Sequence, residues 1–260
     1  ITKWETNRGL PDVENMIILA EIFKVTLDEL VPQRTIEVET NEEVFVSETV
    51  YDIDYDKHFD IRIGNARKIC ITTCDEEKVR IKLQSEVWDN LDARYKVKID
   101  ERKNRLDIEC QNQKSASKME AENSLDIQIL LPKNFTEHCE IDASVKELYI
   151  ENLKMKCLEY DGAADLIYIR DVEGSLEFTG KTDYEMMIDG ICSKVDVNQW
   201  GAKTLIRVAD ISKYTVLNKG RKSKVYYIKD GVRSEENLGE NGECIISVSG
   251  IRSELTISNR

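Results

Sequence analysis

The fold is decided by six short windows in the second half of the chain, which read YIENL (149–153), YIRDV (168–172), MIDGI (187–191), RVADI (207–211), YIKDG (227–231) and SVSGI (247–251). Their second residues follow one another at spacings of 19, 19, 20, 20 and 20 residues. The fourth residue of every window is Asn, Asp or Gly, which tolerate a left-handed turn. The spacing therefore predicts a repeated strand and turn.

A second strand pattern lies between the windows, as LEY (158–160), LEF (176–178) and VDV (195–197). Each period thus supplies two short strands and two turns, which predicts one coil of a β-solenoid with 19–20 residues per coil. Apolar columns would stack from coil to coil, because one coil cannot bury its own face. A plain β-meander with short hairpins is the alternative. The pattern loosens at residues 221–224 and 234–242, where we expect insertions or a cap.

Further strands are predicted upstream of the repeat, at 59–64, 68–73, 78–83, 95–100, 105–110 and 125–131. Apolar and polar residues alternate in each of these segments, which is the period of a half-buried strand. Polar breaks at Gly64-Asn65, at 75–77 and at 101–104 separate them. Because one side of each strand is polar, the set is expected to be antiparallel with solvent on one face.

The composition sets limits on function. Of the 260 residues, 41% are hydrophobic, enough for a core, and 33% are charged, with a net charge of −13. So acidic a chain does not bind nucleic acid through its overall field, and any DNA contact must come from a local basic surface. There is no apolar run long enough to predict a membrane-spanning helix.

Seven cysteines at irregular spacings predict reduced, mostly buried thiols in a cytoplasmic protein. Cys70 and Cys74 are the nearest pair to a metal motif, but neither His58 nor His138 has ligand spacing to them. The residues Asp52, Asp54 and Asp56 have the D-x-D-x-D spacing of a calcium loop without its Gly and Glu positions. We therefore predict no metal site and no cofactor.

The N-terminal segment has a helical pattern instead. Asp12 is a plausible N-cap for an apolar stripe running to Phe23, and Thr26 with Glu29 forms a capping-box pattern for a second short helix. The blocks Lys3-Trp4-Glu5, Leu10-Pro11-Asp12, Leu19-Ala20 and Val25–Leu30 resemble the C-terminal part of a helix-turn-helix domain of the XRE (Cro and lambda repressor) type. The resemblance covers about 30 residues. The first helices of such a domain would lie upstream of Ile1, so we expect the sequence to be a fragment or a processed product.

This resemblance implies DNA binding by Thr2, Lys3, Asn7 and Arg8, once the domain is completed upstream. In the family a recognition helix enters the major groove, where Lys3 would face the bases, while Asn7 and Arg8 in the following turn would meet phosphate. Most members of the family have Gly where Asn7 stands. The alternative is that these polar side chains are solvated and do not contact DNA.

The second resemblance covers residues 58–260. The block IRIGNARKICITTCDEEKVRIKL (61–83) and the repeated windows resemble a bacterial β-solenoid family often labelled "putative adhesins" of unknown function. This resemblance implies an adhesin-like module. The family has no catalytic residues that could be assigned to positions of this chain.

We predict no catalytic residues and no enzyme. The acids Asp171, Asp210 and Asp230 fall in the turn column, and a turn-forming role explains them, although a carbohydrate-active solenoid enzyme is an alternative. His138 and Cys139 are neighbours on a strand and should point to opposite faces. Several aromatic residues could line a sugar-binding face but are more typical of core: Tyr160, Tyr168, Phe178, Tyr184, Trp200, Tyr214, Tyr226 and Tyr227.

Taken together, the sequence predicts a mainly β protein with a helix-turn-helix remnant at 1–32, an acidic linker at 33–57 and a β domain at 58–260. An edge strand is the alternative for part of the linker. The favoured function is a cytoplasmic transcriptional regulator that binds operator DNA as a homodimer, with the β domain serving oligomerisation, partner binding or sensing of a protein or small-molecule effector, and with no membrane contact. The alternative is a non-enzymatic, adhesin-like structural or carbohydrate- or protein-binding module.

Overall fold

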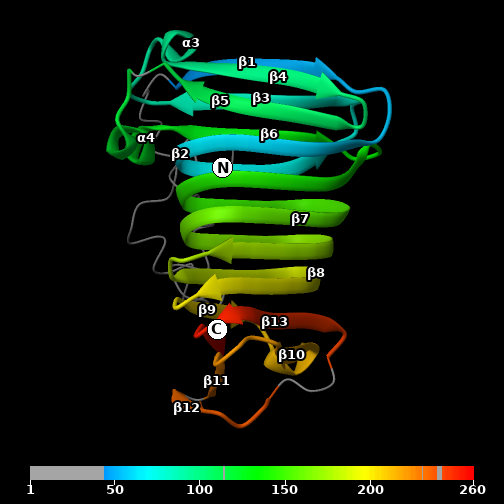
Figure 1. The fold of residues 1–260 in the computed structure, drawn as a ribbon, viewed down its shortest axis with the longest axis vertical. Coiled ribbons are helices and arrows are strands. Elements are labelled where there is room, and N and C mark those ends of the chain that lie inside the picture. Colours follow the sequence, from blue (N-terminus) through cyan, green and yellow to red (C-terminus); the bar gives the residue numbers. More distant parts are fainter. Residues whose placement is uncertain (1–43, 114, 230, 239–241) are drawn as a thin grey trace, which may run out of the picture. The chain divides into compact units, whose positions relative to one another are not determined.

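Alternating burial of side chains marks the strands of residues 44–260. The structure, a computed structural model, describes residues 44–113, 115–229, 231–238 and 242–260 (Figure 1). In β3 every second side chain is buried, as the alternating sequence predicts. The first elements are β1 (Phe45–Asp52), β2 (Lys57–Cys74), β3 (Lys78–Ser85), α3 (Leu91–Arg94), β4 (Tyr95–Arg102), β5 (Arg105–Asn112), α4 (Lys118–Ser124) and β6 (Asp126–Pro132).

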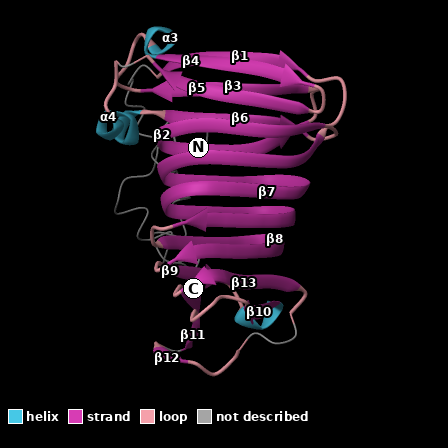
Figure 2. Cartoon of the chain, viewed as in Figure 1, coloured by secondary structure: helices cyan, strands magenta, loops and turns pink. Residues whose placement is uncertain are grey.

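Long bent strands follow in the second half. They are β7 (Thr136–Gly180), β8 (Tyr184–Trp200), β9 (Lys203–Val208), the 3-10 helix η1 (Ile211–Lys213), β10 (Tyr214–Asn218), β11 (Lys224–Lys229), β12 (Val232–Ser234), β13 (Cys244–Ile251) and β14 (Glu254–Asn259). Strands dominate the described part of the chain, so the prediction of a mainly β fold is confirmed (Figure 2).

The strands stack in two rows, because β2, β7 and β8 each bend and contribute to both. In the first row, residues 58–62 of β2 pair in parallel with β5 on one side and with β7 on the other. In the second row, residues 68–74 of β2 pair in parallel with β6. The buried side chains of both rows join into one apolar cluster. We refer to the edge where the chain passes from the first row to the second as the crossing edge.

The predicted repeat is present in the middle of this stack. Ile169 pairs with Ile188, and Ile188 pairs with Val208, which are offsets of 19 and 20 residues. In the other row Leu176 pairs with Val195. The predicted left-handed turns are also found, with φ of 52° at Asn152, 51° at Asp171, 63° at Gly190 and 90° at Gly250. The described pairings form a 14-stranded sheet whose path does not close, and the coils of a solenoid stay a prediction.

Two windows depart from the predicted column. Val248 pairs with Val197 in the first row, and Ile228 pairs with Ser258, one position away from the column of Val208. The cause is a change of order at the C-terminal end, where β13 lies between β8 and β10, and β14 lies between β9 and β11. The last strand pair, β13 and β14, is therefore inserted between the pair β8–β9 and the pair β10–β11. The spacing of the windows along the chain does not predict this insertion.

Two predictions about the first strands need correction. The antiparallel expectation holds for β1 with β3, β3 with β6 and β4 with β5, but β2 pairs in parallel with β5, β6 and β7. Residues 45–52 of the predicted acidic linker form strand β1, which is antiparallel to β3. Its outward carboxylates suit an edge strand, since one side of β1 stays open to solvent.

Candidate functional site

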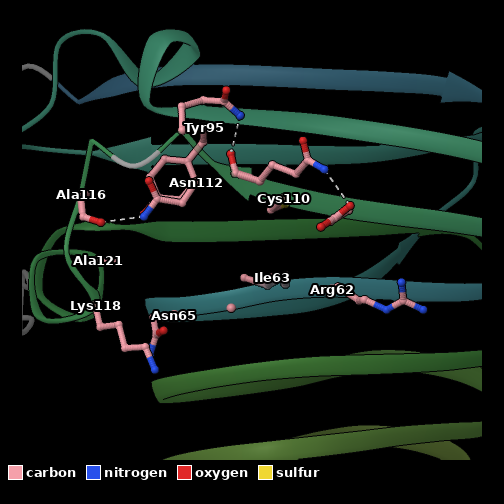
Figure 3. A pocket seen from close by; sticks show the side chains of 13 residues that line it. Arg62, Ile63, Asn65, Tyr95, Cys110, Asn112, Ala116, Lys118 and Ala121 are labelled. Carbon is pink, nitrogen blue, oxygen red and sulfur yellow. Dashed lines mark hydrogen bonds between the residues drawn. The ribbon is translucent and has the colours of Figure 1, made fainter.

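A pocket of about 540 Å³ lies at the crossing edge beside α4 (Figure 3). It exists because two neighbouring turns of the stack have different lengths. Strand β2 crosses the edge within one continuous strand, bending at Gly64, whose φ is +80°. Its neighbour β5 ends at Asn112, and the chain returns to the sheet only at Asp126, so the intervening segment with α4 forms an overhang. We call this the α4 pocket.

Local hydrogen bonds hold the overhang in place. Ser117 and Glu120 form a capping box, in which the Glu120 amide donates to Ser117 Oγ over 3.2 Å and the Ser117 amide donates to Glu120 Oε2 over 2.7 Å. Asn65 Nδ2 donates to Glu122 Oε1 over 2.7 Å, which ties α4 to the turn of β2. Asn112 Nδ2 donates to the Ala116 carbonyl over 2.7 Å. The walls of the pocket are therefore preorganised.

The lining of the α4 pocket mixes polar and apolar residues. They come from β2, β4, β5, α4 and the segment between β5 and α4: Arg62, Ile63, Gly64, Asn65, Tyr95, Glu109, Cys110, Gln111, Asn112, Gln113, Ala116, Lys118 and Ala121. Among them, Gln111 Nε2 donates to Glu109 Oε2 over 2.8 Å, and Arg62 reaches Asp60 Oδ2 over 2.9 Å. Carboxamides carry both donors and acceptors, so this surface matches a ligand rich in hydroxyl or amide groups.

Tyr95 is the unusual member of the lining. The residue is 4% exposed, and its hydroxyl has no hydrogen-bond partner among the described residues. Tyr95 is the register partner of Asn112 across the β4–β5 pair, and Figure 3 shows it on the side of the pocket bounded by Ala116 and α4. A buried polar group without a partner costs free energy, so a native structure that keeps one calls for an explanation at that site. Tyr95 lines the pocket although its hydroxyl oxygen is shielded from solvent, so a bound ligand that reaches this oxygen would supply the partner it lacks.

Burial raises the pKa of two titratable groups in the pocket wall. Burial raises the pKa of Tyr95 to about 12, and the nearby Cys110 adds to the shift. Burial also raises the pKa of the Cys110 thiol to about 12. Both groups are thus neutral near pH 7, where Tyr95 offers a hydroxyl and Cys110 is a poor nucleophile. In the part of the chain that the structure describes, His, Cys, Asp and Glu side chains form no group that could hold a metal ion.

The predicted DNA-binding residues Thr2, Lys3, Asn7 and Arg8 lie outside the described residues, as does the whole predicted helix-turn-helix remnant. The seven cysteines are free thiols, but Cys110, Cys139 and Cys192 alone are buried, so the expectation of mostly buried thiols is wrong. Partial exposure of the others follows from their places on outward-facing or turn positions. No helix in the ranges described is both long and apolar enough to cross a membrane.

Most of the acidic residues predicted in turns, and most of the aromatic residues predicted in the core, occupy positions that a structural role explains. Asp171 lies in a left-handed turn, and Asp210 Oδ1 accepts the Ser212 amide hydrogen over 3.0 Å at the start of η1, while Asp230 is not described. Unlike Asn152, Asp171, Gly190 and Gly250 of the same column, Asp210 has a φ of −153°. Most of the aromatic residues proposed as core are buried or stacked. Trp200 is the exception, with 45% of its surface exposed.

No residue of the α4 pocket was singled out by the sequence patterns except at the Gly64-Asn65 break. A local signal was present, because the capping-box sequence Ser117-Lys-Met-Glu120 predicts a helix start between two strands. A helix inserted at a turn of a strand stack is a place where a concave surface forms. Nothing local shows that Tyr95 lies against it.

Comparisons with known proteins give distant structural likeness alone. No protein-family model matches the chain, and no curated protein matches it. Among solved structures, a "putative cell adhesion protein" from Clostridium sporogenes is 9% identical, with a TM-score of 0.37 over 84% of this chain and 100% of that one. A "putative adhesin" from Bacteroides fragilis is 12% identical, with a TM-score of 0.31 over 83% and 97%.

A "putative lipid binding protein" from Parabacteroides distasonis is also similar, at 13% identity and a TM-score of 0.32, over 83% of this chain and 97% of that one. Two of these names coincide with the adhesin-type family that the sequence resembles. None of these three similar structures is named as a helix-turn-helix protein of the XRE type. At these identities and TM-scores, the likeness carries no argument about what this chain binds.

Proposed function

We propose that residues 44–260 form a non-enzymatic binding module, built as a β-solenoid, which takes a small hydroxyl-rich ligand such as a sugar in the α4 pocket. One observation carries the proposal: Tyr95, whose buried hydroxyl has no hydrogen-bond partner among the described residues, is one of the residues that line the α4 pocket. Sugar hydroxyls both donate and accept hydrogen bonds, as do the carboxamides of Asn65, Gln111 and Asn112 around it.

The proposal favours the binding-module alternative over the regulator. The DNA-binding prediction depends on residues 1–32, and no feature of the described residues supports it. The two readings are compatible in one chain, because a ligand-binding β domain could also serve as the sensor of a regulator. We put forward the binding module because it is the part with a definable site.

The test is a glycan-array screen with the full chain, followed by calorimetric titration of any neutral oligosaccharide that binds. We expect a neutral sugar to bind the wild type and to lose about tenfold or more in affinity in Tyr95→Phe and Gln111→Ala. Gln128→Ala is the matched control, since Gln128 lies on β6 outside the pocket. Absence of any neutral ligand, or equal binding by all four proteins, would overturn the proposal.

A further inference from the structure

A second concave surface lies on the same crossing edge, at the opposite end of the stack. Three turns meet there: Gly201 between β8 and β9, Arg252 between β13 and β14, and residues 219–223 between β10 and β11. Together they line a pocket of about 420 Å³, which we call the cationic corner: Trp200, Gly201, Arg221, Lys222, Ile251 and Arg252. It shares no residue with the α4 pocket.

The charge of the cationic corner opposes that of the chain. The protein has a net charge of −13, yet three cations and no carboxylate line this pocket. Arg233 on β12, in contrast, forms an ion pair with Glu254, which is the usual way in which a surface arginine is neutralised. Within the described residues, Arg221, Lys222 and Arg252 have no such acidic partner. Three cations at one pocket, without an acidic partner among the described residues, create a local positive potential that attracts anions.

The backbone at two of these cations is strained. Lys222 has a φ of 59° and Arg252 a φ of 56°, in the left-handed region that glycine and asparagine favour. Gly201, at the corresponding turn of the neighbouring strand pair, has a φ of 68° and is the residue type that such a turn prefers. Turn formation therefore does not explain the two long cationic side chains, and strain of this kind is often found at functional sites.

The turns beneath these side chains are fixed by hydrogen bonds. The Arg252 amide donates to the Arg221 carbonyl over 2.9 Å, and the Arg221 amide donates to the Gly250 carbonyl over 2.8 Å. Below them, Ser253 Oγ donates to the Gln199 carbonyl over 2.5 Å, with both residues buried. These bonds fix the backbone positions from which Arg221 and Arg252 project, side by side on neighbouring turns.

Trp200 supplies an apolar face beside the cations. It is 45% exposed, whereas Trp88 is 5% exposed and Phe178 of the same row is fully buried. An exposed indole next to guanidinium groups offers a flat surface for the C–H face of a sugar ring and charged donors for its acidic substituent. Guanidinium groups bind carboxylate, sulfate and phosphate oxygens with directed hydrogen bonds.

We infer that the cationic corner binds an acidic sugar, with the ring stacked on Trp200 and its carboxylate or sulfate held by Arg221, Lys222 and Arg252. A sugar fits better than a nucleic acid, because single-stranded nucleic acids need a positively charged groove that follows many phosphates. Here the cations are confined to one corner of an acidic chain. The ligand therefore carries its charge on one or two rings.

The test is calorimetric titration of the full chain with trigalacturonate and with a sulfated disaccharide, at low and moderate salt. Maltotriose is the neutral control sugar, inorganic sulfate the free anion, and a short oligothymidylate the nucleic acid. We expect at least one acidic sugar to bind more tightly than all three controls. Affinity should fall about tenfold in Trp200→Ala and in the double variant Arg221→Gln/Arg252→Gln. The double variant Lys98→Gln/Arg102→Gln on β4 removes equal charge elsewhere and should bind as the wild type does.

A second pair of substitutions separates binding from folding. Lys222→Gly and Arg252→Gly remove charge and also relieve the left-handed backbone, so both should weaken binding while the melting temperature stays level or rises. The inference is overturned if no acidic sugar binds, if inorganic sulfate binds equally well, if oligothymidylate binds more tightly, or if Trp200→Ala leaves affinity unchanged. Because the two sites share no residue, these results do not depend on the α4 pocket.

Discussion

At the scale of single residues, the buried tyrosines Tyr160 and Tyr95 differ in the hydrogen bonding of their hydroxyl groups. The Tyr160 hydroxyl lies 3.0 Å from the Ala143 carbonyl and 2.8 Å from the Ala163 carbonyl, so it has partners inside the protein. The Tyr95 hydroxyl has none among the described residues. Burial of the ring stabilises the fold at both places, whereas the hydroxyl does so at Tyr160 alone.

The substitutions Tyr160→Phe and Tyr95→Phe should therefore differ in effect without ligand. Removal of a satisfied buried hydroxyl costs about 1–2 kcal/mol, because the partner carbonyls lose a donor. Removal of an unsatisfied one should leave the free energy of unfolding within about 0.5 kcal/mol of the wild type, or raise it. Urea denaturation measures both. A loss at Tyr95→Phe as large as that at Tyr160→Phe would mean that the hydroxyl is already satisfied.

Lys57 is a second residue whose surroundings give a prediction. Its side chain is 1% exposed and contacts Glu101, the carbonyl of Lys103 at 3.2 Å, and the ring of Tyr55, whose centroid lies 3.2 Å from Nζ. Hydrogen bonds from Lys57 and Tyr51 lower the pKa of Glu101 below its ordinary value of 4.5. The carboxylate thus stabilises the fold above that value, and its contribution is lost as the pH falls through the lowered pKa.

Glu101→Gln should accordingly reduce stability near pH 7 and flatten the fall of stability with pH below about pH 4.5. The reason is that the buried Lys57 ammonium loses the nearer of two carboxylate partners, keeping exposed Asp54 at 3.9 Å, and the protein loses a carboxylate of lowered pKa. Glu137→Gln is the control, because Glu137 pairs at 2.7 Å with Lys156, which is 65% exposed. Chemical denaturation between pH 3 and 7 compares them. Parallel pH profiles for wild type and Glu101→Gln would contradict the prediction.

At the scale of elements, glycines decide where neighbouring turns can approach. Gly162 has a φ of +147°, and a Cβ there would lie 1.8 Å from the Ala143 carbonyl oxygen of the adjacent turn. Gly64 has a φ of +80° with nothing within 4 Å of a Cβ. Both positions have a positive φ, which glycine adopts without strain. Gly162 alone also lacks the space for a Cβ atom.

Gly64→Ala should therefore cost about 1 kcal/mol, the strain of a side chain at positive φ. Gly162→Ala should cost more than about 3 kcal/mol, because two backbone segments must separate. Thermal and urea unfolding of the two variants give the comparison. Equal destabilisation would show that the turns can move apart at little cost.

The local parts of this architecture could be predicted from sequence, and the pairings could not. Alternation places strands at 59–64 and 105–110, since each side chain reports its own environment. The parallel contact of β2 with β5 joins segments that are separated by two other strands, so no period marks it. The same holds for the α4 pocket, where Tyr95 and Asn65 come together from different elements. An unsatisfied hydroxyl is a property of three-dimensional packing alone.

At the scale of the whole molecule, the order of the strands sets which parts depend on one another. In a stack, each strand pair contacts its two neighbours, and stability is close to a sum over these contacts. The pair β13–β14 separates β10 and β11 from β8 and β9. The part of the chain from β10 to β12 thus joins the stack through residues that follow it in sequence.

Deletion of residues 244–260 should consequently release β10 and β11 while β2 and the first part of β7 stay folded. Hydrogen exchange followed by mass spectrometry should show amides of 214–218 and 224–229 exchanging at the rate of unpaired chain, with 58–71 protected as in the full chain. Removal of Arg260 alone is the control and should change neither segment. Protection retained at β10 and β11 would mean that they dock directly onto β8 and β9. In that case β10 and β11 would pair directly with β8 and β9 when β13 and β14 are absent, and β13 and β14 would not be required for the rest of the stack to fold.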